Sequence, residues 1–568
     1  MKLMKYAVAL TILLCAIPTL SRAAGTGTVQ AVGGGSSAIF LELGQGAQSA
    51  AATSTPCVWS FGSSASITAG DNRTSPATNE QGNIWITWSA GTGSCATPGA
   101  PYNIYAYLQL DSAVGDKCYF EVDSSGTPGC VMNISIAAGT AGAGKILTSG
   151  ETAIPADVIA SLNGKHFTYA GTDIRPEDAK FATYRLFQNC GSFVFRNPFD
   201  LGSRLVYGLG YGTSTTGVGL QILSAFSAKL FNVIDFNVTG NDPFTGSAVP
   251  TYSVKAIGAQ PIVVAVAPAG GTGIGAATDI NGFTLSLFYE GILARSTDLL
   301  GPTTANGVTT LVREPLSGTY NTFEYSMPNS SQFHTSQDDN FCNGNATFSQ
   351  TMNIASGVGN VSGARRARVI GTGEMVATLQ AATTDTLGYF FWSAGNANGL
   401  SNVKYLTVNG VDPILDAYGS SGGTSYTPGA LPQASPGSGV PPLTAVSFKN
   451  LNAGDYPVWS AVRLVTASSV PAGVSNLLTA LGTEDLTQHD YITLANLKVW
   501  HSHFPLAATG QTTYANGTTI NTANDLCNAS GALAEVGGDA GGTNVLKQVN
   551  ADFCSDFSST QGLINKVN

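Results

Sequence analysis

The run Gln260-Pro-Ile-Val-Val-Ala-Val-Ala267 is apolar at almost every position. A strand that is buried on both faces has this continuous character, because neither face meets water. Tyr456-Pro-Val-Trp-Ser-Ala-Val-Arg-Leu-Val465 has a similar pattern, and strand-like and helix-like segments alternate along much of the chain. This alternation predicts an α/β fold whose layers surround a largely parallel sheet.

Composition limits the classes of function. The 568 residues are enough for two or more domains, and the 68 glycines and 11% charged residues favour short strands, glycine-rich loops and modest helices. The formal net charge of -10 argues against nucleic-acid binding, which rewards basic patches. A small anion is still an acceptable ligand, because a buried site binds through its local donors.

The N-terminus has the pattern of a cleaved secretory signal peptide. Lys2 and Lys5 precede an apolar stretch from Ala7 to Leu20, and a small-residue cleavage site ends at Ala24. We expect residues 1–24 to be removed and the protein to be periplasmic or secreted.

The cysteine count fits an exported chain. Nine cysteines are present, and removal of Cys15 with the signal peptide leaves an even number, which indicates disulfides. Pairing of nearest neighbours gives four candidate bridges, of which the second and fourth are favoured as the most local: Cys57–Cys95, Cys118–Cys130, Cys190–Cys342 and Cys527–Cys554. Other connectivities stay open. The chain has no Cys-x-x-Cys pair, so neither a zinc ribbon nor a thioredoxin-like motif is expected.

One short run concentrates donors for an anion: Arg313-Glu-Pro-Leu-Ser-Gly-Thr319. The guanidinium of Arg313 matches the oxygens of phosphate or carboxylate, and the hydroxyls and backbone N–H groups of Ser317 to Thr319 add further donors. A helix that begins here would favour a bound anion through its dipole. The alternative is an ordinary turn with a helix N-cap.

Four earlier segments complete an ordered series: Gly33-Gly-Gly-Ser-Ser37, Val58-Trp-Ser-Phe-Gly-Ser63-Ser64, Phe167 to Asp173, and Pro261 to Ala267. With the Arg-x-x-x-Ser-Gly-Thr spacing of Arg313 to Thr319, this series resembles the periplasmic phosphate-binding proteins of ABC phosphate transport. The earlier segments are similar to that family's first glycine loop, its second loop with an anion-binding serine, the strand that delivers a ligand aspartate, and a hinge strand.

The resemblance implies the type II periplasmic binding protein fold, in which two α/β lobes are joined by hinge strands. It places lobe 1 at residues 25–260, with a β-rich, disulfide-containing insertion at about 65–165, and lobe 2 at 261–456. Residues 457–568 would return to lobe 1 and form a C-terminal extension. The sequence departs from the family at Pro315, where an acidic residue often stands, so we expect Arg313 to be oriented differently or Glu314 to substitute.

Carried over residue by residue, the resemblance implies a phosphate site without metal, cofactor or catalytic group. Its members would be Ser37, the N–H of Ala38, Ser63 and Asp173 from lobe 1, and Arg313, Ser317, Gly318 and Thr319 from lobe 2. Phosphate near neutral pH keeps a proton that it can donate to a fixed carboxylate, whereas sulfate has none. Asp173 would therefore select phosphate.

Simpler interpretations of the same residues stay open. Asp173 could cap a helix and pair with Arg175, and Ser37 and Ser63 could be turn residues. We expect an exported, monomeric binding protein for phosphate or a related oxyanion, with an ABC transporter membrane component as a candidate partner. The alternative is an extracellular or cell-surface interaction protein that uses the same fold with a degraded pocket. A secreted hydrolase is disfavoured, since no catalytic triad or metal set assembles along the sequence.

Overall fold

The computed structural model describes residues 27–174, 238–327, 365–502 and 563–566, apart from short gaps inside these ranges, and a few residues between them. The signal peptide expected at residues 1–24 lies outside them. Within the described part, the protein has the predicted α/β architecture and is built on one 13-stranded sheet. No helix in this part has both the length and the apolar character needed to cross a membrane.

The sheet runs in the order β12-β13-β11-β14-β9-β19-β8-β1-β6-β5-β2, and β15 and β20 pair with β9 beside this path. Its strands are β1 (Thr28–Gly35), β2 (Pro56–Phe61), β5 (Ile84–Ser89), β6 (Asn103–Gln109), β8 (Tyr169–Thr172), β9 (Tyr252–Ala267), β11 (Thr309–Val312), β12 (Thr351–Met352), β13 (Arg365–Arg368), β14 (Thr386–Phe391), β15 (Lys404–Tyr405), β19 (Trp459–Ala467) and β20 (Ile492–Thr493).

Smaller sheets and the helices surround it. The short strands are β3 (Ile67–Asp71), β4 (Thr78–Gln81), β7 (Val131–Ile134), β10 (Asp279–Ile280), β16 (Thr407–Val408), β17 (Ser420–Ser421), β18 (Thr424–Ser425), β21 (Val499–Ser502) and β22 (Leu563–Lys566). The helices are α2 (Phe40–Ala51), α3 (Ser112–Phe120), α4 (Ala156–Leu162), α9 (Gly282–Tyr289), α10 (Thr297–Leu300), α11 (Gly318–Ser326), α12 (Gly371–Ala381), α13 (Ala394–Ala397), α14 (Lys449–Asn452) and α15 (Ala472–Gln488), with 3-10 turns at Ile274–Ala276 and Leu443–Ala445.

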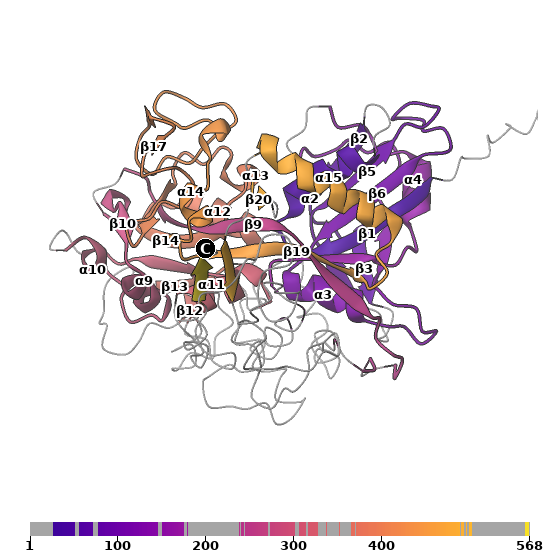
Figure 1. Cartoon of the computed structure of the whole chain (residues 1–568), viewed down its shortest axis with the longest axis horizontal. Helices are drawn as coiled ribbons and strands as arrows, with labels where there is room; N and C mark the ends of the chain where they lie inside the picture. Colours follow the sequence, from indigo (N-terminus) through magenta and orange to yellow (C-terminus); the bar gives the residue numbers. More distant parts are fainter. Residues whose placement is uncertain are drawn as a thin grey trace, which may run out of the picture.

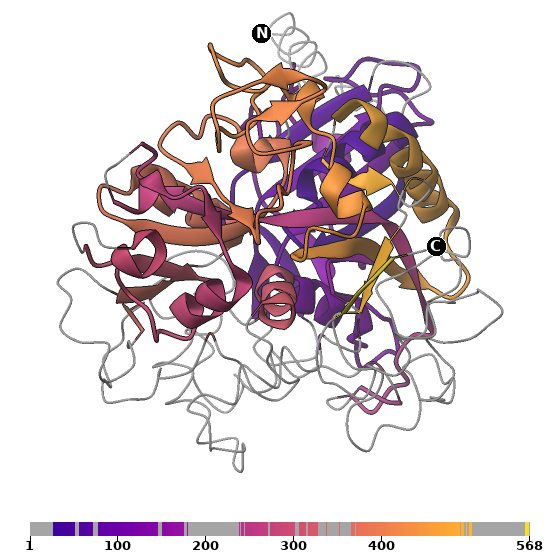
Figure 2. The same cartoon turned by 60° about the vertical axis from the view of Figure 1, so that its left-hand side comes forward.

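Strand β9 connects the two halves of the sheet. It pairs with β19 from Tyr252 to Pro261 and with β14 from Ile262 to Ala267. We call the half with β8, β1, β6, β5 and β2 lobe 1, and the half with β14, β11, β13 and β12 lobe 2. Figures 1 and 2 show the indigo and purple segments of lobe 1 on one side of these crossing strands and lobe 2 on the other. β9 changes partner next to the expected boundary at residue 260, although the residue limits of the lobes stay a prediction.

The apolar run in β9 is buried as its sequence predicts. Every residue from Ile257 to Ala267 is buried, because other segments cover both faces of the strand. The helix after β19 belongs with lobe 1, since α15 packs against α2 (Figure 1). Helix α15 therefore lies on the N-terminal lobe, although it follows lobe 2 in sequence.

The prediction of a largely parallel sheet is wrong, because the sheet is mixed. Among its described strands, parallel pairing is limited to β6-β1-β8 in lobe 1 and β13-β11-β14 in lobe 2. β9 and β19 run in opposite directions between the lobes and pair antiparallel with each other and with their neighbours. Within the segment expected as an insertion at about 65–165, β5 and β6 belong to the main sheet, and β3, β4 and β7 form a smaller one.

Two of the expected disulfides are confirmed. Cys57–Cys95 ties β2 to the loop after β5, and Cys118–Cys130 ties α3 to the segment before β7. The remaining candidates lie outside the described residues: Cys190, Cys342, Cys527 and Cys554. Disulfides persist in oxidising compartments, so these two bridges agree with an exported protein.

We expect a mild thiol reductant to reduce Cys57–Cys95 before Cys118–Cys130 in the folded protein. The attacking thiolate needs access to a sulfur, and Cys95 is partly exposed whereas Cys118 and Cys130 are 0% exposed. Differential alkylation followed by mass spectrometry gives the order, and denatured protein, in which both bridges are accessible, is the control. Earlier reduction of Cys118–Cys130 would contradict its burial beside α3.

Candidate functional site

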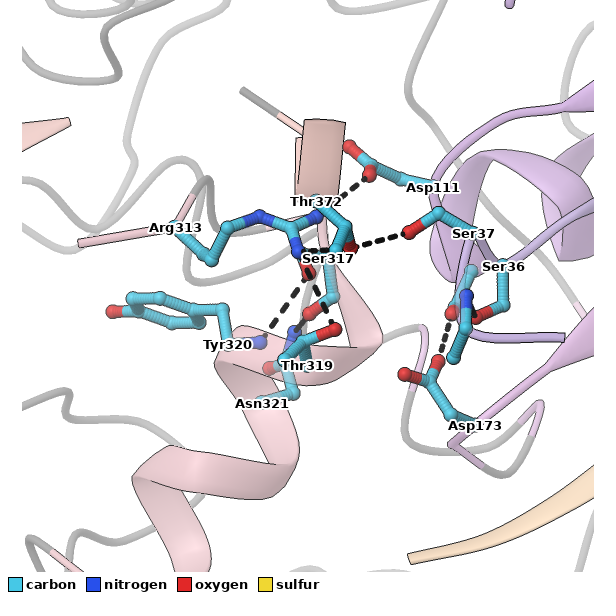
Figure 3. Close-up of polar contacts among 12 residues, drawn as sticks. Ser36, Ser37, Asp111, Asp173, Arg313, Ser317, Thr319, Tyr320, Asn321 and Thr372 are labelled. Atoms are coloured by element: carbon cyan, nitrogen blue, oxygen red, sulfur yellow. Dashed lines mark hydrogen bonds and ion pairs between the residues drawn. The ribbon is translucent and has the colours of Figure 1, made fainter. Parts of the chain in front are cut away.

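Arg313 lies at the centre of a buried polar group between the lobes (Figure 3). It directly follows β11, and it is 1% exposed. Its Nη1 donates to the hydroxyl of Thr372 at 3.0 Å and to that of Thr319 at 3.4 Å. Its Nη2 lies 3.6 Å from Oδ1 of Asp111, which belongs to lobe 1. The guanidinium therefore contacts residues of both lobes.

Helix α11 begins directly after Ser317, as the alternative interpretation of the Arg313 run predicts. Ser317 is the N-cap, and its hydroxyl accepts a hydrogen bond from the backbone N–H of Tyr320 at 3.3 Å. Gly318 and Thr319 form the first turn, where backbone N–H groups have no partner within the helix. An N-cap and an anion site are compatible here, because the same N–H groups and the helix dipole favour negative charge.

The loop after β1 brings Ser37 to the same group. The hydroxyl of Ser37 lies 2.9 Å from that of Thr372, which is in the first turn of α12 in lobe 2. The expected donor on Ala38 is close by, and its N–H donates to the hydroxyl of Ser36 at 3.1 Å. The chain here runs from β1 through a short loop into α2.

Asp173 follows β8 and is completely buried. Its Oδ1 accepts a hydrogen bond from the hydroxyl of Ser112, and its backbone carbonyl accepts one from Ser460 in β19 at 2.6 Å. Burial raises the pKa of the Asp173 carboxyl, and the bond from Ser112 and the charges of Arg313 and Arg463 only partly offset this effect. The site thus holds one carboxyl that a bound proton donor would satisfy.

Gly318 is the point at which lobe 2 touches this carboxyl. A Cβ atom added at Gly318 would overlap Oδ1 of Asp173 and crowd the hydroxyl of Ser112. These atoms belong to buried side chains, so a residue larger than glycine would force the side chains or the lobes to shift. The glycine in the Ser-Gly-Thr run therefore allows the close approach of the lobes.

Ser63, the remaining expected site residue, has its hydrogen-bond partner within lobe 1. It follows β2, and its backbone N–H donates to Oδ1 of Asn83 at 3.1 Å. β2 pairs with β5, and β5 pairs with β6, which is the neighbour of β1. With adjacent strands about 4.8 Å apart, β2 lies about 10 Å outward from β6. The residues that follow β6, Asp111 and Ser112, contact Arg313 and Asp173 instead.

Sequence reasoning missed Asp111, Ser112 and Thr372. A signal for the first two was available, because Tyr102 to Leu110 has a strand pattern and polar residues follow it directly. Ligand-binding residues of open α/β sheets gather after the carboxyl ends of parallel strands. Thr372 lies in the first turn of α12, and its hydroxyl bonds to both Arg313 and Ser37. Arg175, Glu314 and Pro315 lie outside the described residues.

One other group in the described part of the chain has the composition of a metal site. Ligand atoms of Cys118, Glu121 and Cys130 lie within 4.8 Å of one another. The two cysteines form a disulfide, so their sulfurs are not the thiolates that bind metals. This group is therefore a structural bridge and not a metal centre.

Comparison with known proteins gives only distant similarities. No protein family model matches the chain, and no curated protein matches it significantly. An ABC-type phosphate transport receptor from Vibrio cholerae is similar at 12% sequence identity, over 44% of this chain and 73% of that one, with a TM-score of 0.25. A phosphate-binding protein from Stenotrophomonas maltophilia is similar at 13% identity, over 66% of this chain and 76% of that one, with a TM-score of 0.29. The function has to be inferred from the site itself.

We expect Asp173→Asn to stabilise the ligand-free protein at neutral pH. The folded-state pKa of Asp173 lies above its ordinary value of 3.8, so the charged carboxyl destabilises the fold, and this penalty fades as the pH falls through the folded pKa. The asparagine variant carries no such penalty. Chemical denaturation over a pH series should show an advantage for the variant at pH 7 that shrinks toward about pH 4. A difference that does not change with pH would contradict the burial of a charged carboxyl.

Gly318→Ala should shift the ligand-free protein toward a more open arrangement, because separation of the lobes relieves the overlap with Asp173 and Ser112. Small-angle scattering would report this as a larger radius of gyration. Gly373→Ala is the matched control, since nothing lies within 4 Å of an added Cβ in helix α12. The control should keep its radius and gain about 0.5–1 kcal/mol of stability. Equal radii for both variants would reject the contact.

Proposed function

We propose that this chain is an exported, non-catalytic binding protein for phosphate or a related oxyanion, held between lobe 1 and lobe 2. One observation carries the proposal. A buried arginine, hydroxyls from both lobes, the start of a helix and the buried carboxyls of Asp111 and Asp173 converge on the same small region: Ser37, Asp111, Asp173, Arg313, Ser317, Thr319 and Thr372 (Figure 3), with Ser112 bonded to Asp173.

The attraction for an anion comes mainly from lobe 2. Arg313 supplies a fixed positive charge, and α11 begins beside it with Gly318 and Thr319. Oxyanions accept hydrogen bonds from such groups, and these bonds are stronger where water is excluded. Ser37 and the N–H of Ala38 in lobe 1 would donate from the other side. Ligand binding would then favour the closed arrangement, because the donors of both lobes meet the anion only when the lobes are together.

Asp173 supports phosphate over sulfate as the ligand. A carboxylate repels a fully deprotonated anion, but it accepts a hydrogen bond from a protonated phosphate oxygen. Ser112 donates to Oδ1 of Asp173, so the carboxyl is held in place by lobe 1. A fixed acceptor discriminates between two anions of similar shape, because sulfate would leave it unsatisfied and repelled. A membrane component of an ABC transporter is a candidate partner of the closed, monomeric protein.

The second candidate is an extracellular interaction protein with a degraded pocket. It is favoured by the direct contacts between the lobes, since Ser37 and Thr372 bond to each other and Asp111 contacts Arg313. In that case the polar groups serve to hold the lobes together, and binding would use the outer surface. Phe283, which is 75% exposed on α9, is an apolar side chain available to such a surface.

Isothermal titration calorimetry on dialysed protein separates these candidates. We expect binding of phosphate and weaker binding of sulfate. Asp173→Asn should lower the preference for phosphate by about tenfold or more, since a hydrogen bond to a charged group contributes about 1.5–3 kcal/mol. Asp123→Asn is the control, because that carboxylate bonds to Ser125 and Thr127 within its own loop. Absence of heat with either anion in folded protein would reject anion binding and favour the interaction protein.

A further inference from the structure

Asp111 stands at a helix N-cap but does not cap the helix. It directly precedes α3, and its side chain makes no capping hydrogen bond. Aspartate at this position usually accepts from an N–H of the first turn. Here its Oδ1 lies 3.6 Å from Nη2 of Arg313, with side chains that are 7% and 1% exposed (Figure 3). The carboxylate is therefore directed at the opposite lobe.

The N-terminus of α3 also contacts lobe 2 directly. The N–H of Ala113 donates to the carbonyl of Leu316, in lobe 2, at 3.2 Å. The side chain of Leu316 is 1% exposed and packs within the hydrophobic core of lobe 1. An ion pair, a backbone hydrogen bond and a buried leucine thus connect the α3 end of lobe 1 to the segment that links Arg313 to α11.

The two terminal nitrogens of Arg313 have different surroundings. Nη1 donates to the hydroxyls of Thr319 and Thr372, on the side where the anion site is proposed. Nη2 contacts Asp111. A buried guanidinium costs free energy unless an opposite charge compensates it, and a carboxylate also fixes the plane of the guanidinium. Asp111 supplies that charge without competing for the Nη1 edge.

We propose that Asp111 is the positioning residue that orients Arg313 for anion binding, and that it acts from the opposite lobe. This inference rests on the proposed function. Because Asp111 and Arg313 belong to different lobes, the oriented arginine exists only in the closed arrangement. Affinity for the anion and closure of the lobes are then coupled through one ion pair. If the Asp111 carboxylate instead occupied the place of the anion, it would compete with the ligand, and removal of its charge would tighten anion binding. The direction of the change in affinity therefore distinguishes the two roles.

The test combines calorimetry with phosphate and small-angle scattering of the ligand-free protein, on the full mature chain. Asp111→Asn should bind phosphate about tenfold more weakly and should have a larger ligand-free radius of gyration. Asp111→Glu should recover part of the affinity, because it restores the charge. Asp123→Asn, which also removes one charge from lobe 1, should change neither quantity. Thermal unfolding confirms that each variant is folded.

Phosphate binding by Asp111→Asn that is unchanged or tighter would overturn the proposal, whatever the ligand-free radius of gyration. Failure of the parent protein to bind phosphate would instead reject the proposed function. The cross-lobe contact would still be measured in that case, since the ligand-free radius does not depend on phosphate. If Asp111→Asn does not fold, Asp111→Ser, which is small and polar, gives the same comparison.

Discussion

The burial of Arg313 is the constraint on which the rest of the site depends. A guanidinium that is 1% exposed needs an opposite charge and hydrogen-bond acceptors, because an isolated charge is costly to remove from water. Asp111 provides a charge from lobe 1, and Thr319 and Thr372 provide hydroxyls from lobe 2. Since these partners come from both lobes, compensation of one charge also determines how closely the lobes approach. The contact of Gly318 with Asp173 is a consequence of that approach.

These partners are available because parallel strands end at the same edge of a sheet. β1, β6 and β8 are parallel in lobe 1, and β11 and β13 are parallel in lobe 2. Polar residues follow their carboxyl ends in turn: Ser37, Asp111 and Asp173 in lobe 1, and Arg313 and Thr372 in lobe 2. Ligands of open α/β sheets bind at such edges. The antiparallel strands β9 and β19 lie between the lobes and hold the two edges opposite each other. Each lobe therefore contributes one edge at which parallel strands end, and the side chains of both edges face one region.

Much of this arrangement could be predicted from local sequence. The apolar run at Gln260 to Ala267 identifies a fully buried strand, and the glycine-rich segment before Ser37 identifies the first loop of the expected site. The Arg313 run contains the helix start that was one of its two interpretations, and the favoured local pair Cys118–Cys130 forms, as does the nearest-neighbour pair Cys57–Cys95. Each of these features depends on residues that are close in sequence, where periodicity and turn chemistry are informative. The loop after β6, which supplies Asp111 and Ser112, was missed because strand pairing depends on residues that are distant in sequence.

By itself, the sequence determined the α/β class, the buried strand that ends at Ala267 and the run of donors that begins at Arg313, and it offered two observed disulfides among other open pairings. These features follow from hydrophobic pattern, glycine position and side-chain chemistry, which act over a few residues. Only the tertiary structure decided that Asp111, Ser112 and Thr372 join the site, that the sheet is mixed, and that a carboxylate of one lobe faces the arginine of the other. Those facts depend on which strands are neighbours and on the free energy of compensating a buried charge. Both are properties of the folded molecule rather than of any one segment.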